Sequence, residues 1–293
     1  MYRRLWFAAC ALLWSGAAWP APQPEHPIAV VAAENFYGDV ARQIGGADVD
    51  VITILSSPDQ DPHEFEASPS TARAVAGARL VIYNGADYDP WMEKLLAGTR
   101  SDQRDVVIVA NLMGRKPGDN PHLWYDPATM PAVASRLTSE LETLDPAHGT
   151  AYRQRLQTFL ASLESVTAKI QAIKARYKGM AVTATEPVFG YMAKALGFEM
   201  RNERFQLAVM NDAEPSAADV AAMENDLESG KVRILFYNSQ VSSDMTRRMV
   251  AIAKTGKVPV VGVSETAPPH TSYQEWIGGE LDAVEKALGG SPS

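Results

Sequence analysis

Two histidines follow proline directly, in segments that come after predicted strands. His63 belongs to the segment Asp-Pro-His-Glu-Phe at 61–65, and His122 belongs to Pro-His-Leu-Trp-Tyr-Asp-Pro at 121–127. Proline keeps the residue before it extended, which places each histidine in a loop, and open α/β sheets bind ligands in loops beyond their strand ends. One such histidine is more often a solvated side chain. Because histidine is the commonest metal ligand, two in matching loops indicate a metal site.

Two glutamates occupy similar positions in the second half of the chain. Glu186 directly follows a predicted strand at 181–185, and Glu265 follows one at 258–263. Taken singly, each is more typical of a helix cap or a surface carboxylate. Their common position at strand ends makes them candidate oxygen ligands. The only cysteine, Cys10, lies in an apolar run near the N-terminus, so the expected ligands are nitrogen and oxygen rather than sulfur.

Further polar and aromatic residues surround these four candidates. A ligating histidine usually donates its other ring N–H to a carboxylate or carbonyl, and three acids that could orient the rings flank the histidines: Asp61, Glu64 and Asp126. The segment at 237–240, which includes Asn238, ends a predicted strand and could supply a hydrogen bond to the site, although a plain strand-to-helix turn is the commoner interpretation. Three aromatic residues could wall the site or pack the core: Trp124, Tyr125 and Phe189.

Short apolar runs must form the elements that position these side chains. Runs without alternation are typical of strands that are buried on both faces of a parallel sheet. Four occur in the first half of the chain, at 28–32, 49–55, 80–83 and 106–109, and three in the second half, at 181–185, 234–237 and 258–263. Helical stretches at 190–196 and 216–228 separate the last three. The pattern predicts an α/β fold with two lobes, each with a mostly parallel sheet flanked by helices.

A helical pattern without internal proline runs between the two lobes, from about residue 146 to 178. Apolar residues recur in it at three- and four-residue spacing, from Leu156 through Phe159 and Val166 to Ile173, which predicts one buried stripe. About 30 helical residues would span about 45 Å. The segment is therefore expected to be a stiff strut, with an ordinary long helix inside one domain as the alternative.

The N-terminus has the order of residues found in a secretory signal peptide. Arg3 and Arg4 precede an apolar run at 5–18, and small residues and prolines follow it. The run is shorter than the roughly 20 residues of a spanning helix, so residues 1–21 are expected to be removed on export, with an N-terminal anchor as the alternative. The run continues well beyond Cys10, so lipid attachment there is not expected. A formal charge of −8 argues against nucleic acid as a partner.

These motifs resemble those of the metal-specific solute-binding proteins of ABC importers. The resemblance rests on the Asp-Pro-His loop at 61–63, the block at 121–127, the Glu-Pro-Val-Phe-Gly-Tyr block at 186–191 and the long helix between the lobes. It implies an N-terminal lobe at 22–145, a backbone helix at 146–178 and a C-terminal lobe at 179–293. It also implies that one metal ion is held by His63, His122, Glu186 and Glu265. Glu265 departs from the family's usual aspartate.

The resemblance further implies where the protein works and with what. We expect a monomeric periplasmic receptor that is not an enzyme and that delivers a divalent ion to an ABC permease and its ATPase in the inner membrane. Two imidazoles and two carboxylates would neutralise a divalent ion, and a carboxylate-rich set suits Mn²⁺ or Fe²⁺, although Zn²⁺ also accepts it and binds tightly. No histidine-rich stretch of the kind found in zinc receptors occurs at 113–119. Mn²⁺ is therefore favoured, with Zn²⁺ or Fe²⁺ as alternatives.

Two other classes of protein remain as alternatives. A secreted metal-dependent hydrolase could use His63, His122 and one glutamate, with water at an open position. The chain has no His-Glu-x-x-His motif, and four protein ligands would leave no place for an activated water. An adhesin or structural surface protein would also be exported, but that function leaves the four candidate ligands unexplained.

Overall fold

Two parallel four-stranded sheets form the centre of the protein. The computed structural model describes residues 27–58 and 65–289. The first sheet has the strand order β2-β1-β3-β4, from β2 (Val49–Leu55), β1 (Ile28–Glu34), β3 (Leu80–Tyr83) and β4 (Asp105–Ile108). The second has the order β6-β5-β7-β8, from β6 (Glu199–Met200), β5 (Ala181–Ala184), β7 (Leu235–Asn238) and β8 (Val260–Val263). The predicted α/β fold with two sheets is confirmed.

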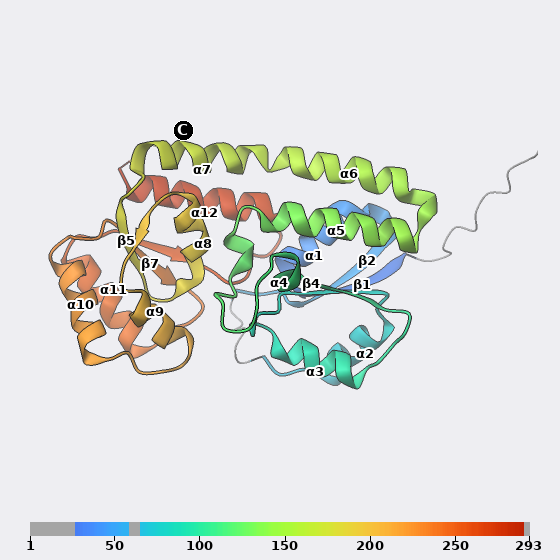
Figure 1. The fold of residues 1–293 in the computed structure, drawn as a ribbon, viewed down its shortest axis with the longest axis horizontal. Coiled ribbons are helices and arrows are strands. Elements are labelled where there is room, and N and C mark those ends of the chain that lie inside the picture. Colours follow the sequence, from blue (N-terminus) through green and yellow to red (C-terminus); the bar gives the residue numbers. More distant parts are fainter. Residues whose placement is uncertain (1–26, 59–64, 290–293) are drawn as a thin grey trace, which may run out of the picture.

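Helices cover both faces of the first sheet, because its central strands are apolar on both sides. In β1, Val30 and Ala32 pack on one face, against α1 (Asn35–Gly45) and α5 (Thr129–Leu144), while Val31 and Ala33 pack on the other. That second face is covered by α2 (Pro69–Gly77) and α3 (Pro90–Gly98) (Figure 1). The continuous burial that the apolar runs predict is therefore present in β1 and β3.

Helices also flank the second sheet. They are α8 (Gly190–Ala195), α9 (Glu203–Met210), α10 (Ala217–Glu228), α11 (Asp244–Thr255) and α12 (Tyr273–Ala287). The first part of the chain also contains a short α4 (Val109–Leu112). The short edge strand β6 was not predicted, because two residues give too little pattern to recognise. No helix among residues 27–58 and 65–289 has the length and apolar character needed to span a membrane.

The segment expected as one long helix is divided into two collinear helices. A 3-10 turn, η3 (Pro146–His148), leads into α6 (Gly149–Ser162), and α7 (Glu164–Tyr177) follows after Leu163. At the division, the Ser162 hydroxyl donates to Phe159 O at 2.6 Å, and Leu163 N donates to Leu160 O at 3.2 Å instead of reaching back four residues. The hydroxyl therefore competes for the carbonyl that the α-helix would use. The two helices still lie end to end (Figure 1).

The predicted apolar stripe of this pair of helices is buried. Phe159, Val166, Ile170 and Ile173 belong to a hydrophobic core that includes residues of both sheets. Helix α12 lies alongside α7 (Figure 1) and Arg176 Nη1 pairs with Glu285 Oε1 at 3.1 Å. The connection between the lobes is thus two helices thick and shares one core with them.

Polar side chains join the start of α6 to the turn between α1 and β2. His148 Nδ1 lies 2.5 Å from Asp145 Oδ2, and the Tyr152 hydroxyl donates to the same oxygen at 2.8 Å. Arg155 Nη1 donates to Asp48 Oδ2 at 2.8 Å, across from η1 (Gly46–Asp48). The hydrogen bond to Asp145 raises the pKa of His148 above its ordinary value. Partial burial opposes the shift at Asp145, but hydrogen bonds from His148 and Tyr152 lower the pKa of its carboxyl.

His148→Gln is expected to destabilise the protein at pH 5.5 and to have little effect above pH 9. A raised histidine pKa stabilises the fold fully below about 6.5, and this contribution is lost as the pH rises through the raised value. The lowered Asp145 pKa adds stability above about 3.9, so the full effect falls between about pH 4 and 6.5. The expected loss in Tm is about 1–2 °C, because partly exposed pairs contribute little. Melting curves with chelator should be compared with His270→Gln, an exposed histidine; equal losses at pH 5.5 and 9 would contradict the assignment.

Candidate metal site

The topology of both sheets creates a crevice at their carboxyl ends. Ligands of open α/β sheets bind where neighbouring strands connect in opposite directions. In the first sheet this point lies between β1 and β3, and in the second between β5 and β7. Glu34 ends β1 and Asn238 ends β7, while Glu186 lies two residues beyond β5. Glu186 and Asn238 therefore lie at the switch point of the second lobe, and Glu265 follows the neighbouring strand β8 (Val260–Val263).

The loop before His122 is held against the first sheet by Asn84, the residue after β3. Asn84 Nδ2 donates to Pro121 O at 2.8 Å, and the Tyr37 hydroxyl donates to Asn84 Oδ1 at 2.7 Å. His122 is completely buried, and its ring packs edge-on against Trp124, with ring centres 5.3 Å apart. A buried amide thus fixes the backbone on which His122 stands.

The His122 ring is oriented by Asn120, not by an acid. Asn120 Oδ1 lies 2.7 Å from His122 Nδ1 and also accepts from His122 N at 3.0 Å. Its Nδ2 donates to a carbonyl, Pro187 O, at 2.8 Å, which fixes the orientation of the amide. The Nδ1 atom must therefore carry the proton, which leaves the lone pair on Nε2. The expectation that Asp126 orients this ring is wrong: Asp126 accepts from Ala128 N at 3.0 Å, because it caps the following turn.

Glu265 lies close to His122, and Asn238 connects Glu265 to Glu186. Asn238 Nδ2 donates to Glu265 Oε1 at 2.7 Å and contacts Glu186 Oε2 at 3.3 Å. His122 Nε2 lies 3.7 Å from Glu265 Oε2. Glu265 is fully buried and Glu186 is 3% exposed. The structure thus brings together three of the four predicted ligands. At the turn at 237–240, the structure thus has the hydrogen bond that the sequence offered only as the less favoured alternative to a plain strand-to-helix turn.

His63 and its flanking acids, Asp61 and Glu64, lie outside the described residues. Within residues 27–58 and 65–289, no group of three or more His, Cys, Asp or Glu side chains has the geometry to hold a metal ion. The predicted set requires His63 in addition, so all four residues remain a predicted ligand set.

Gln240 fixes the backbone of the second glutamate. Its Oε1 accepts from Glu265 N at 2.5 Å and from Thr266 N at 2.9 Å. The glutamate found here in place of the family's usual aspartate therefore stands on a loop whose backbone amides are held by a side chain from the end of β7. This arrangement limits the positions that the longer side chain can take.

Aromatic rings form a wall that crosses from one lobe to the other. Tyr125 meets Phe189 edge-on at 5.2 Å between ring centres, and Phe189 stacks on Phe236 at 4.4 Å. The Tyr125 hydroxyl donates to Ser264 O at 2.8 Å. The aromatic residues singled out from the sequence thus pack the core and also border the candidate site. They exclude water from its inner side.

A pair of buried acids in the first lobe, Glu34 and Asp89, was not predicted. Glu34 is fully buried, and burial together with the Asp89 carboxylate raises its pKa well above the ordinary value. Burial also raises the pKa of Asp89 to about 6, against the lowering effect of hydrogen bonds from Gly85 N and Asn84 N. Burial therefore makes both carboxyl groups bind a proton more readily than exposed carboxyl groups do. An acid that ends an otherwise apolar strand, as in Ala-Ala-Glu at 32–34, was the available signal.

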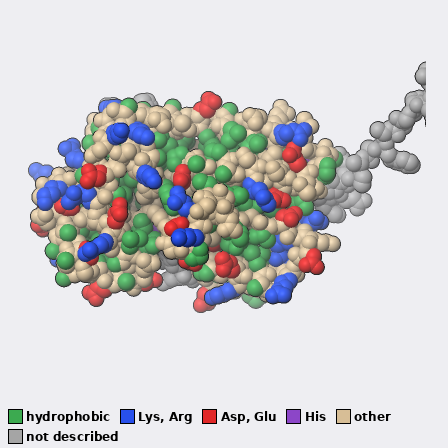
Figure 2. All heavy atoms as spheres, in the orientation of Figure 1, with side chains coloured by type: hydrophobic (Ala, Val, Ile, Leu, Met, Phe, Trp, Pro, Cys, Tyr) green, Lys and Arg blue, Asp and Glu red, His purple; other side chains and the backbone are tan. Residues whose placement is uncertain are grey.

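Charged side chains of both signs are interspersed over the face of the molecule in Figure 2. The buried His122, Glu186 and Glu265 contrast with this mixed surface. Two α/β lobes, each with a parallel sheet, and buried histidine and glutamate side chains between them are typical of two-lobed ligand-binding proteins. The chain belongs to the family of the periplasmic component A of zinc-uptake complexes, whose sequence model matches residues 30–287.

Relatives of known name cover nearly the whole chain. It is 24% identical over 283 residues to the iron ABC transporter substrate-binding lipoprotein MtsA of Streptococcus pyogenes, covering 88% of each chain. It is 23% identical over 282 residues to the manganese ABC transporter substrate-binding lipoprotein PsaA of Streptococcus pneumoniae, again covering 88% of each. These relatives are substrate-binding proteins of ABC transporters, so the comparisons give no support to a hydrolase.

Solved structures agree on the fold. The periplasmic zinc binding protein TroA from Treponema pallidum superimposes with a TM-score of 0.74 at 20% identity, over 90% of this chain and 99% of that one. A Mn-bound periplasmic metal binding protein from Candidatus Liberibacter asiaticus gives a TM-score of 0.73 at 16% identity, over 88% and 98% of the two chains. At these identities the likeness concerns the fold.

Proposed function

We propose that this protein captures one divalent transition-metal ion in the periplasm and delivers it to the permease and ATPase of an ABC importer. The observation that carries the proposal is the meeting of His122 with Glu265, 3.7 Å apart, and of Glu265 with Glu186 through Asn238. His63 completes the proposed ligand set. The ion is cargo, so the protein acts as a receptor without turnover, and we expect it to be monomeric.

Mn²⁺ is the favoured cargo, with Zn²⁺ or Fe²⁺ as alternatives. Two neutral imidazoles and two carboxylates balance the charge of a divalent ion, and carboxylates that bind through both oxygens permit coordination numbers above four. The relatives do not decide the metal, because MtsA is named for iron, PsaA for manganese and TroA for zinc.

Cys10 lies outside the described residues. We keep the proposal of a cleaved leader without lipid, although two of these relatives are lipoproteins.

Addition of the correct ion should raise the melting temperature of metal-free protein by roughly 8–15 °C. An ion that binds only the folded state, present at a thousand times its Kd, stabilises that state by about 4 kcal/mol, which corresponds to roughly 2–4 °C per kcal/mol in a chain of this size. The unfolded chain cannot bring together ligands about 200 residues apart. Elemental analysis of protein purified without added metal should find one ion per chain. No shift with Mn²⁺, Zn²⁺ or Fe²⁺ would sink the proposal.

A further inference from the structure

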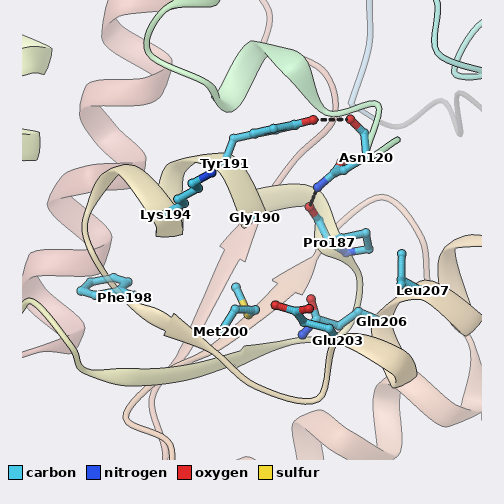
Figure 3. Close-up of a pocket in the computed structure, with 10 residues that line it drawn as sticks. All are labelled: Asn120, Pro187, Gly190, Tyr191, Lys194, Phe198, Met200, Glu203, Gln206 and Leu207. Atoms are coloured by element: carbon cyan, nitrogen blue, oxygen red, sulfur yellow. Dashed lines mark hydrogen bonds between the residues drawn. The ribbon is translucent and has the colours of Figure 1, made fainter. Parts of the chain in front are cut away.

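Asn120 contacts both sides of the candidate site. In the first lobe, its Oδ1 accepts a hydrogen bond from Nδ1 of the His122 ring at 2.7 Å. Its Nδ2 donates to Pro187 O of the second lobe at 2.8 Å (Figure 3). Pro187 directly follows Glu186. A single amide group therefore connects the orientation of one predicted ligand to the chain that carries another.

The backbone of Asn120 reinforces the same connection. The Tyr191 hydroxyl donates to Asn120 O at 2.8 Å (Figure 3), and Arg115 lies over the Tyr191 ring, 5.0 Å from its centre. The start of α8 is thus tied to the first lobe by two neighbouring side chains. We call this set the Asn120 latch, defined by Asn120, Pro187 and Tyr191.

The fit of the latch depends on a glycine. A Cβ atom added at Gly190 would lie 3.1 Å from Asn120 Nδ2, closer than nearly all ordinary Cβ contacts. Gly190 does not need its flexibility here, since its φ of −59° is open to any residue. The absence of a side chain at Gly190 leaves room for the Asn120 amide to approach the second lobe closely. A surface pocket of about 380 Å³ borders the latch and is also lined by Tyr191 and Lys194.

We propose that Asn120 is a positioning residue that couples ion coordination to the closed arrangement of the lobes. It holds Nδ1–H of His122, which leaves Nε2 as the ligand atom, and it secures the Glu186 chain with the other end of the same amide. Separating the lobes must break the bond to Pro187 O and the bond from Tyr191. The freed amide can still accept from Nδ1–H but is no longer held in place, so the ring is less firmly positioned and the ion is bound less tightly. The release part of this proposal rests on the proposed function.

The variants of Asn120 separate its two contacts. Asn120→Asp keeps an acceptor for His122 Nδ1–H but places a carboxylate oxygen against Pro187 O, so it breaks the side-chain bond to Pro187 O and leaves the backbone bond from Tyr191. Asn120→Ala removes both contacts. Tyr191→Phe and Gly190→Ala disturb the latch without touching His122. Asn111→Asp, an exposed asparagine of the first lobe, is the matched control.

Two readouts test the proposal. The first is the ¹⁵N spectrum of the His122 ring in metal-free protein at pH 8, which reports which nitrogen carries the proton. The Nδ1–H form should persist in Asn120→Asp, Tyr191→Phe and Gly190→Ala and become mixed in Asn120→Ala. The second is release of Mn²⁺ or Zn²⁺ to excess chelator, which should be about 10-fold faster in Asn120→Asp and Asn120→Ala, in the range of changes around metal ligands. The other two variants should release the ion a few-fold faster, and Asn111→Asp at the parent rate.

The outcomes distinguish the two proposals. If Asn120→Ala retained a pure Nδ1–H ring, Asn120 would not position His122. If Asn120→Asp released the ion at the parent rate, the latch would not couple closure to release. If the parent protein bound none of the ions, the proposed function would fail, while the ring spectrum would still decide the positioning role. Melting curves with chelator identify any variant that is merely unfolded.

Discussion

His122→Ala is expected to lower the affinity for the captured ion by at least about 100-fold, because even residues that only support metal ligands cost about 10- to 100-fold when they are changed. The substitution removes the nitrogen that faces Glu265 at 3.7 Å from within a fully buried site. No other described histidine can take its place, since His148 and His270 lie on other segments of the chain. Isothermal titration of metal-free protein, with competing chelator for tight binding, measures the loss.

The loss of affinity must be separated from a loss of folding. The His122 ring packs on Trp124 and faces Tyr88, so alanine leaves a gap and should lower the melting temperature of the metal-free protein. His122→Gln fills more of that space and should recover much of the stability, but not the affinity. His270→Ala should bind as the parent does. Parent-like affinity in both His122 variants would place the site elsewhere.

The fold was predictable because its strands have a simple sequence signature. β1 and β3 are apolar runs buried within a parallel sheet, and β2 is a partly exposed strand at its edge; the sequence predicts each of the three to within two residues. The edge strand β6 has two residues, Glu199 and Met200, and pairs only with β5. Its position depends on the neighbouring strand rather than on its own pattern. The division at Leu163 escaped prediction for a related reason, since it follows from one hydroxyl of Ser162 that selects a carbonyl within the helix.

The sequence indicated the positions of the candidate ligands, but it indicated only some of the residues that form hydrogen bonds with them. Strand ends and proline-framed loops place His122, Glu186 and Glu265 from local sequence alone. For Asn238, the end of a predicted strand allowed a hydrogen bond to the site, but a plain strand-to-helix turn was the favoured interpretation. Asn120 was missed, although it stands two residues before His122. The general rule favours a carboxylate as the partner of a ligating histidine, and it directed attention to Asp126. Asn120 is held in position to orient His122 by its hydrogen bond to Pro187 O. That bond joins residues 67 positions apart, which the local sequence cannot show.

The acid pair of Glu34 and Asp89 could not be paired from sequence for the same reason. Glu34 ends β1, whereas Asp89 lies after β3, directly before α3, and only the order β2-β1-β3-β4 makes β1 and β3 neighbours. Their raised pKa values affect the charge of the site. Each carboxyl group therefore binds a proton more readily than an exposed carboxyl group does.

Glu186→His is expected to shift the preference of the site from Mn²⁺ toward Zn²⁺. Glutamate offers one or two oxygens and a negative charge, whereas histidine offers one nitrogen and none. With His63, His122 and Glu265 unchanged, the variant would hold a divalent ion with three imidazoles and one carboxylate, a set closer to what zinc prefers. Affinity for Mn²⁺ should fall by about 10-fold or more relative to that for Zn²⁺, in the range of changes at metal ligands. Competition between the two ions measures the ratio directly.

Glu186→Gln is the matched control for this substitution. It preserves the length of the side chain and an oxygen that can accept from Asn238 Nδ2, which lies 3.3 Å from Glu186 Oε2, but it removes the negative charge. Affinity should then fall for both ions, with little change in their ratio. The argument depends on Glu186 touching the ion. If both variants kept their Mn²⁺ and Zn²⁺ dissociation constants within about twofold of the parent, below the roughly 10-fold cost of changing even a supporting residue, Glu186 would not be a ligand. The second lobe's contribution would then rest on Glu265 and Asn238, which already share a hydrogen bond of 2.7 Å.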